Sequence, residues 1–294
     1  MPRSIPGSDI TERSAWLLLG SSGRPSVARL LGGRTGRLGA VLCLPVVLLG
    51  LLAPWIAPTD PAVIVGQALQ APTWAHWMGT DDLGRDVLSA MIFGARTSLL
   101  VGVTVATIAF VVGAVVGAVA GYKGGRVDDA LMRGTEFFQV VPRFFLAIMA
   151  IALFGPGLDR VILVLGLTSW PSLARVIRAD TLALMQQDFV LAARAAGASG
   201  ARVIAREVLP NALPSALALL GLLVGQVLLI EASLGFIGLG DPNLISWGGQ
   251  AGQANAFLRI AWWLPLFPGI AIALTVLGCN LMADAATDAL QADR

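Results

Sequence analysis

Residues 98–120 read SLLVGVTVATIAFVVGAVVGAVA, an apolar run without a single charged side chain. About 20 consecutive apolar residues are enough for an α-helix to cross the roughly 30 Å hydrocarbon core of a bilayer. This stretch therefore predicts a membrane-spanning helix and decides the class of the fold. Three further stretches pass the same test, namely residues 38–58, 212–230 and 262–283.

Two weaker candidates lie between these spans. Residues 130–154 have a half-polar beginning and end in FFLAIMAIALF, and residues 159–177 contain a central Trp-Pro pair. Weakly apolar spans of this kind are usually shielded from lipid by neighbouring protein. We therefore predict an all-α integral membrane protein with six transmembrane helices.

The composition excludes several classes of protein. Hydrophobic residues make up 56% of the chain and charged residues 13%, whereas an average soluble domain has about 25% charged residues. A soluble enzyme and a disordered chain are therefore excluded. The net charge of +2 is too even to indicate nucleic-acid binding. Cys43 and Cys279 lie in distant apolar runs and cannot form a framework of disulfides or a four-cysteine zinc site.

Basic residues predict the orientation, because cytoplasmic segments carry an excess of Lys and Arg. With the N-terminus in the cytoplasm, the inner segments hold 15 basic residues and the outer segments hold 4, so both termini are expected inside. The chain then divides into a cytoplasmic tail (1–37), a first transmembrane helix (38–58), an outer loop (59–95), a core with five transmembrane helices (96–285) and a cytoplasmic tail (286–294). A second outer loop is expected over 232–261.

The residues needed for common chemistries are missing. Lys123 is the only lysine and does not stand in a phosphate-binding Gly-Lys-Ser/Thr motif, and His76 is the only histidine. A two-histidine metal site is therefore impossible, and we predict no catalytic, cofactor-binding or metal-binding site in this chain. His76 is interpreted as an interfacial polar residue flanked by Trp74 and Trp77.

An ion-coupled secondary transporter is the alternative function from another class. Such proteins carry ionisable residues near the middle of the membrane, and the candidates here are Glu136, Arg143, Glu231 and Asp284. All four lie near span ends or in the half-polar third span. We interpret them as structural pairs or as groups that contact water at helix ends.

Gly113, Gly117 and Gly121 recur at four-residue spacing, which places them on one helix face. Small residues allow helix backbones to approach closely. The stripe is interpreted as packing within the chain in preference to an interface with a partner.

The inner loop, residues 188–210, predicts two short helices. Ala and Arg favour a helix up to Ala196, and Gly197 is expected to provide the left-handed turn that follows. Ser199 is placed to cap a second helix, which Pro210 is expected to end. Its apolar side chains, Val203, Ile204 and Val208, suit either a groove on another protein or a lipid surface.

The chain carries five motifs whose order and spacing resemble those of a known family of proteins. The run AARAAG (192–197), nine residues and then EVLPN (207–211) resembles the EAA loop of ABC-importer permeases. The other four are similar to the dipeptide/oligopeptide/nickel permease family: HWMGTDDLGRDVLSAMIFGARTSLLVG (76–102), WPSLARVIR (170–178), EASLGFIGLG with SWG (231–248), and a C-terminal run from Pro268 to Ala289. The resemblance covers roughly residues 40–290, and within the family the chain resembles the "C" partner of a permease pair.

The chain departs from the family pattern at two places. Leu191 stands where the EAA loop usually has Glu, which removes or displaces a carboxylate that would cap a helix or pair with arginine. Gln291-Ala-Asp stands where Asp-Pro often follows the C-terminal run.

The resemblance implies a type I importer core in a bacterial inner membrane. Its expected partners are a homologous permease in a heterodimer, two cytoplasmic ABC ATPases, an extracytoplasmic substrate-binding protein and membrane lipid, with no nucleic acid. ATP and Mg would be bound by the ATPases. Peptides are the expected substrate, and nickel, another metal chelate or glutathione is the alternative. The resemblance assigns ATPase coupling to the inner loop: Ala192, Ala193, Arg194, Gly197, Arg202, Ile204, Arg206, Leu209 and Pro210.

The outer loop ends in a charged segment. Val87, Met91 and Ala95 can share one face, which predicts an amphipathic helix along the membrane surface near the mouth of the passage. The charged residues before it are expected to face water or the binding protein, the alternative being a solvated linker: Asp81, Asp82, Arg85 and Asp86.

Overall fold

A computed structural model describes residues 30–291, so most of the predicted N-terminal tail lies outside the described residues. Every regular element within them is helical. The elements in order are α3 (Arg34–Ile56), α4 (Val87–Lys123), α5 (Gly125–Val140), α6 (Arg143–Phe154), α7 (Leu158–Leu184), α8 (Asp188–Ala195), α9 (Gly200–Val203), the π-helical turn η1 (Ile204–Val208), α10 (Leu209–Phe236), α11 (Trp247–Ala254), the 3₁₀ turn η2 (Asn255–Phe257) and α12 (Trp263–Gln291).

The described residues contain five helical segments that are long and apolar enough to cross a membrane, and six spans if the bent pair α5–α6 is counted as one. The all-α prediction is therefore confirmed. Helix α7 continues through Pro171 to Leu184. Helix α12 reaches Gln291, so the predicted C-terminal tail begins as a continuation of the last span.

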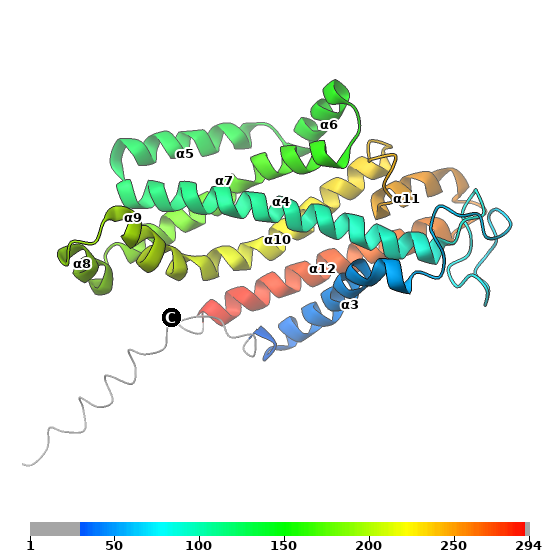
Figure 1. The fold of residues 1–294 in the computed structure, drawn as a ribbon, viewed down its shortest axis with the longest axis horizontal. Coiled ribbons are helices and arrows are strands. Elements are labelled where there is room, and N and C mark those ends of the chain that lie inside the picture. Colours follow the sequence, from blue (N-terminus) through cyan, green and yellow to red (C-terminus); the bar gives the residue numbers. More distant parts are fainter. Residues whose placement is uncertain (1–29, 292–294) are drawn as a thin grey trace, which may run out of the picture.

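Helices α4 and α7 form the centre of the molecule (Figure 1). Helix α10 packs against both and also against α12, and α3 packs against α12 and α4. The largest apolar core lies between α4, α6, α7 and α10, with Leu165, Leu173 and Ile177 among its buried side chains. The outer layer formed by α5 and α6 contacts α4 and α7 and leaves its other face open.

The third predicted span is broken. Helix α5 ends at Val140, α6 begins at Arg143, and the two axes differ by 72°. Pro142 explains the break, because a proline lacks an amide hydrogen and disfavours helical backbone in the residue that precedes it. Val141 accordingly has an extended backbone.

The prediction of a separate surface helix at the end of the outer loop is wrong. Helix α4 begins at Val87 and continues without a break to Lys123, so this segment forms the first turns of the second span. Val87, Met91 and Ala95 do share one face, but that face is buried in a second apolar cluster with Trp247 and Trp263. Burial against protein produces the same spacing of apolar residues as burial in lipid.

Candidate coupling element and outer pocket

The inner loop folds as two short helices at the end of the molecule where α4 and α7 terminate (Figure 1). Gly197 has a φ of +81°, which is the left-handed conformation expected from the sequence. The amide of Ala198 donates to the carbonyl of Ala193, and the amide of Gly197 donates to that of Arg194. These two hydrogen bonds form a Schellman motif, which ends α8 and turns the chain toward α9.

The inner loop is fixed to the spans by a small apolar core of its own. Val190, Val203 and Val208 are fully buried, and they pack with Tyr122 of α4 and Leu184 of α7. The expectation that Val203 and Val208 face a partner protein or lipid is therefore wrong. The spacing of apolar residues along the second helix identifies its apolar face. It does not show whether that face is covered by the rest of the chain or by a partner.

Pro210 does not end the second helix. The chain widens into the π-helical turn η1, in which the amide of Leu209 donates to the carbonyl of Ile204, and then continues as α10. A π turn removes the clash that a proline ring makes with the preceding turn of an α-helix. Ser199 stands at the start of α9 but makes no capping hydrogen bond with its side chain.

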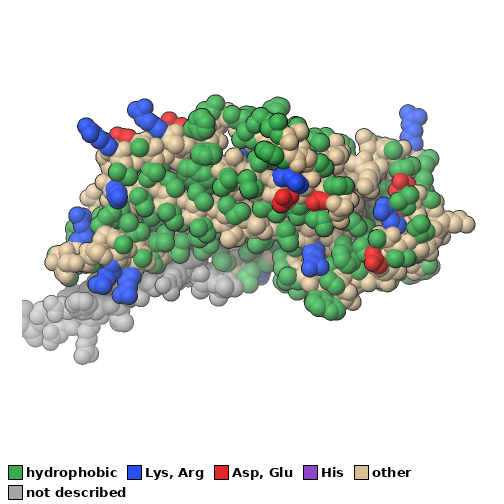
Figure 2. Space-filling view, turned by 45° about the horizontal axis from the view of Figure 1, so that its top comes forward, with side chains coloured by type: hydrophobic (Ala, Val, Ile, Leu, Met, Phe, Trp, Pro, Cys, Tyr) green, Lys and Arg blue, Asp and Glu red, His purple; other side chains and the backbone are tan. Residues whose placement is uncertain are grey.

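Sequence reasoning missed the exposed apolar side chains of this element. Phe189 and Leu191 of α8 are 42% and 48% exposed, although their neighbour Val190 is fully buried. Among the residues predicted to couple to ATPases, Arg194, Arg202, Arg206, Ala192 and Gly197 are exposed. Ala193, Ile204, Leu209 and Pro210 are half-buried. In Figure 2, Lys and Arg side chains gather at this end of the molecule. The element therefore presents apolar and basic groups together.

The glycine stripe of α4 lies against α7. A Cβ atom added to Gly117 would meet the carbonyl oxygen of Ala174 at 2.4 Å, and one added to Gly121 would meet the Cβ of Thr181 at 2.7 Å. Gly113 faces Leu173 in the same way. These glycines bring the two central helices together within the chain, at the end from which the inner loop projects.

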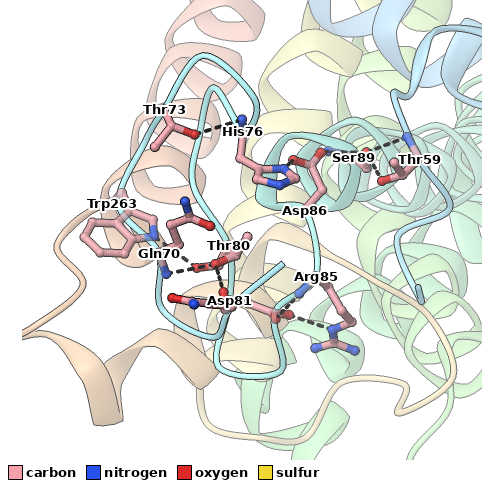
Figure 3. Close-up of polar contacts among 11 residues, drawn as sticks. Thr59, Gln70, Thr73, His76, Thr80, Asp81, Arg85, Asp86, Ser89 and Trp263 are labelled. Atoms are coloured by element: carbon pink, nitrogen blue, oxygen red, sulfur yellow. Dashed lines mark hydrogen bonds and ion pairs between the residues drawn. The ribbon is translucent and has the colours of Figure 1, made fainter. Parts of the chain in front are cut away.

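At the opposite end, the α3–α4 connection (residues 57–86) is held by side-chain hydrogen bonds (Figure 3). Asp86 is buried and caps α4, because its Oδ2 accepts from the amide of Ser89 at 2.8 Å and from the Ser89 hydroxyl at 2.7 Å. Its Oδ1 lies 3.2 Å from Nδ1 of His76. The prediction that Asp86 faces water is therefore wrong, and His76 is a partner of the cap, although Trp74 and Trp77 beside it are exposed.

Two more residues organise this connection. Asp81 accepts through Oδ1 from the amides of Leu83 and Arg85, and through Oδ2 from Nε of Arg85 at 2.6 Å. The buried Thr80 hydroxyl donates to the carbonyl of Gln67, and the Thr80 carbonyl accepts from the indole of Trp263 at 3.2 Å. The connection is thus tied both to itself and to the start of α12.

A pocket of about 730 Å³ lies between the α3–α4 connection and the segment that joins α10 to α11. Asp81, Asp82 and Arg85 line one side, and Asp241 and Gln250 are among the residues on the other. Nearby, the buried Glu231 of α10 accepts from the hydroxyl of Ser98 of α4 at 3.3 Å, so it pairs two spans as expected for a structural role.

Among residues 30–291 there is no group of three or more His, Cys, Asp or Glu side chains arranged to hold a metal ion. Long apolar helices join the end that carries the inner loop to the end that carries the α3–α4 connection and the pocket. This arrangement defines a multi-pass α-helical membrane protein.

The particular family follows from sequence comparison. Residues 113–294 match the family described as the binding-protein-dependent transport system inner membrane component, and the chain belongs to that family. It is a multi-pass inner-membrane permease of that kind.

Three relatives illustrate the likeness. A Brucella suis protein with a provisional name as a peptide transport system permease is 42% identical over 89% of both chains. The dipeptide transport system permease protein DppC of Bacillus subtilis is 35% identical over 89% of this chain and 83% of its own. The oligopeptide transport system permease protein OppC of Bacillus subtilis is 32% identical over 91% of this chain and 88% of its own.

Proposed function

We propose that this chain is one of two homologous permease subunits of an ATP-driven importer that brings di- or oligopeptides into the cytoplasm. Two ABC ATPases would bind ATP and Mg and supply the energy, and an extracytoplasmic binding protein would deliver the peptide. Family membership and the names of the relatives support this assignment. Both termini would be cytoplasmic, as the distribution of basic residues predicts.

The observation that carries the coupling role is the surface of the inner loop. Phe189 and Leu191 expose apolar area beside Arg194, while the valines beneath them hold the element rigidly to α4 and α7. A short helix with an apolar face suits a groove on a partner protein, and basic residues suit an acidic rim. Movement of docked ATPases would then be passed through a firmly attached element to the long helices.

Uptake by the reconstituted transporter tests the function. The chain, its partner permease, both ATPases and the binding protein are placed in proteoliposomes, and uptake of a labelled dipeptide is measured. We expect uptake to require ATP and to survive a protonophore. Uptake that stops with the protonophore and persists without ATP would instead establish an ion-coupled transporter.

Competition identifies the substrate class. Unlabelled dipeptides and oligopeptides should reduce the uptake of labelled dipeptide, whereas glutathione and a nickel chelate should not. Efficient competition by either of the latter, with none by peptides, would replace the peptide assignment by the corresponding alternative.

Labelling of single cysteines tests the orientation. In a chain with Cys43 and Cys279 replaced by Ser, a cysteine at Gln70 should react with an impermeant thiol reagent added outside the cell. A cysteine at Ser199 should react only after the cytoplasmic side is opened. The reverse pattern would overturn the proposed orientation.

A further inference from the structure

The outward face of α5 carries four charged side chains, the first of which is the exposed Arg126 near the start of the helix. Asp129, Arg133 and Glu136 are spaced by four and three residues, which places them in one row along the helix. All three are exposed, and none takes part in an ion pair within the part of the chain that the structure describes. They also line, with Met132, a hollow of about 500 Å³ on the surface.

The other face of α5 is anchored to the rest of the chain. Asp128 is buried, and its two carboxylate oxygens accept from Nε and Nη2 of Arg178 on α7, each at 2.5 Å. Thr135 on the same side is also buried. This attachment fixes the rotation of α5, so the charged row is held away from α4 and α7.

The row extends to a depth at which α4 is apolar. The chain reverses at Gly124, and α5 returns alongside α4 (Figure 1). Residues equally distant from Gly124 therefore lie at a similar level, which pairs Arg133 with Val115 and Glu136 with Val112. At a rise of 1.5 Å per residue, Glu136 lies about 18 Å along α5 from the turn. Val115 is 60% exposed, as expected for a side chain that contacts lipid.

Charged side chains at this level cannot face hydrocarbon without a large cost, so the row must face water or another protein. Figure 2 shows acidic and basic side chains beside one another at the end of the molecule where α5 begins. A dry protein interface would require a separate partner for each of the charges in the row. A water-filled passage requires none.

We propose that Asp129, Arg133 and Glu136 line the aqueous passage between this chain and its permease partner and contact the charged ends of a zwitterionic peptide. This inference rests on the proposed function. With Arg126 at its start, the row alternates in charge in the order positive, negative, positive, negative. A peptide's ammonium group and its carboxylate therefore each find an opposite charge, whereas a row of one sign would repel one of the two ends.

Cysteine accessibility tests the location of the row. Single cysteines replace Arg133 and Glu136 in the cysteine-free chain, and matched cysteines replace Val115 and Val111, which are exposed on α4 at the same level. In the assembled transporter, an impermeant maleimide should label the two α5 positions and leave the two α4 positions unlabelled. Trapping the ATPases with ATP and vanadate should change the labelling of α5. Equal labelling at all four positions, or none on α5, would overturn the proposal.

Substrate variants test the contact with peptide ends. Uptake of a free peptide is compared with uptake of its N-acetylated and C-amidated forms, each normalised to its binding by the binding protein. Arg133→Gln should reduce the preference for the free carboxylate, and Glu136→Gln the preference for the free ammonium, each by about two- to fivefold. An unchanged preference in both variants would overturn the contact. If the parental transporter takes up no peptide, the proposed function fails, and the labelling result still decides whether the row lines the passage.

Discussion

The inner loop and the α3–α4 connection lie at opposite ends of the spans and are stabilised in different ways. Three fully buried valines hold the inner loop, and two large apolar side chains of α8, Phe189 and Leu191, are exposed. The α3–α4 connection is held by hydrogen bonds centred on Asp81, which accepts from amides of the connection itself, and on Asp86, which accepts from the Ser89 amide at the start of α4. An element whose polar groups are satisfied internally needs no partner to be stable. Both elements leave apolar area uncovered, at Phe189 and Leu191 of the inner loop and at Trp74 and Trp77 of the connection, and uncovered apolar area is suited to a partner.

The largest effect is expected from the turn of the inner loop. Gly197→Val places a β-branched residue at a φ of +81°, where L-residues are strained, although no atom lies within 4 Å of the added Cβ. Strain of this kind should reduce coupled uptake by about tenfold to a hundredfold. ATPase pull-down and peptide uptake at matched permease levels would measure it.

Gly269→Val is the control for this substitution. Gly269 also has open space around its Cβ position but lies in α12 without a positive φ. The Gly269→Val variant should therefore transport peptide at close to the parental rate. If both variants behave alike, backbone conformation at Gly197 is not what matters for coupling.

A smaller effect, on stability, is expected at the opposite end. Asp86→Ala removes the cap of α4 and leaves the Ser89 amide and His76 without their partner. The loss of an N-cap costs about 1–2 kcal/mol. Thermal unfolding in detergent should show a lower midpoint for Asp86→Ala, and Asp82→Ala, whose side chain makes no hydrogen bond among the described residues, should not. A parental midpoint for Asp86→Ala would mean that the polar network does not stabilise the connection.

Substitutions on α8 separate docking from folding. Leu191→Ser should weaken retention of the ATPases by about fivefold, because an exposed apolar contact is lost, and should leave the unfolding midpoint unchanged. The adjacent Val190→Ala should instead destabilise the permease by about 1–3 kcal/mol, because it opens a cavity in the small valine core. Weakened folding in both variants would show that α8 has no free surface for a partner.

The smallest effect is expected from Asp82 at the mouth of the outer pocket. Asp82→Lys should reduce stimulation of ATP hydrolysis by the binding protein by about twofold, since a charge at the edge of an interface acts mainly on the rate of association. Asp81 is the poorer choice for this test, because its carboxylate also holds Arg85 and the backbone of the connection. If neither salt nor this substitution changes the stimulation of ATP hydrolysis by the binding protein, the charged segment that contains Asp82 is better described as a solvated linker.

The sequence predicted the parts of this protein that depend on local pattern. Apolar length alone located the spans, because hydrocarbon admits only helices whose backbone groups are satisfied internally. The four-residue spacing of Gly113, Gly117 and Gly121 showed that they share a face, and Gly197 marked the left-handed turn because few other residues adopt that conformation. Each of these signals is contained within a few helical turns.

Only the tertiary structure decided what each of these faces contacts. Val87, Met91 and Ala95 have the spacing of a surface helix, yet they pack against Trp247 and Trp263, which lie far away in the sequence. Val203 and Val208 likewise became a core beneath α8, which left Phe189 and Leu191 as the exposed apolar groups. Periodicity reports that a face is buried but not what buries it. The choice between lipid, protein and water is made by contacts between residues that are distant in the chain.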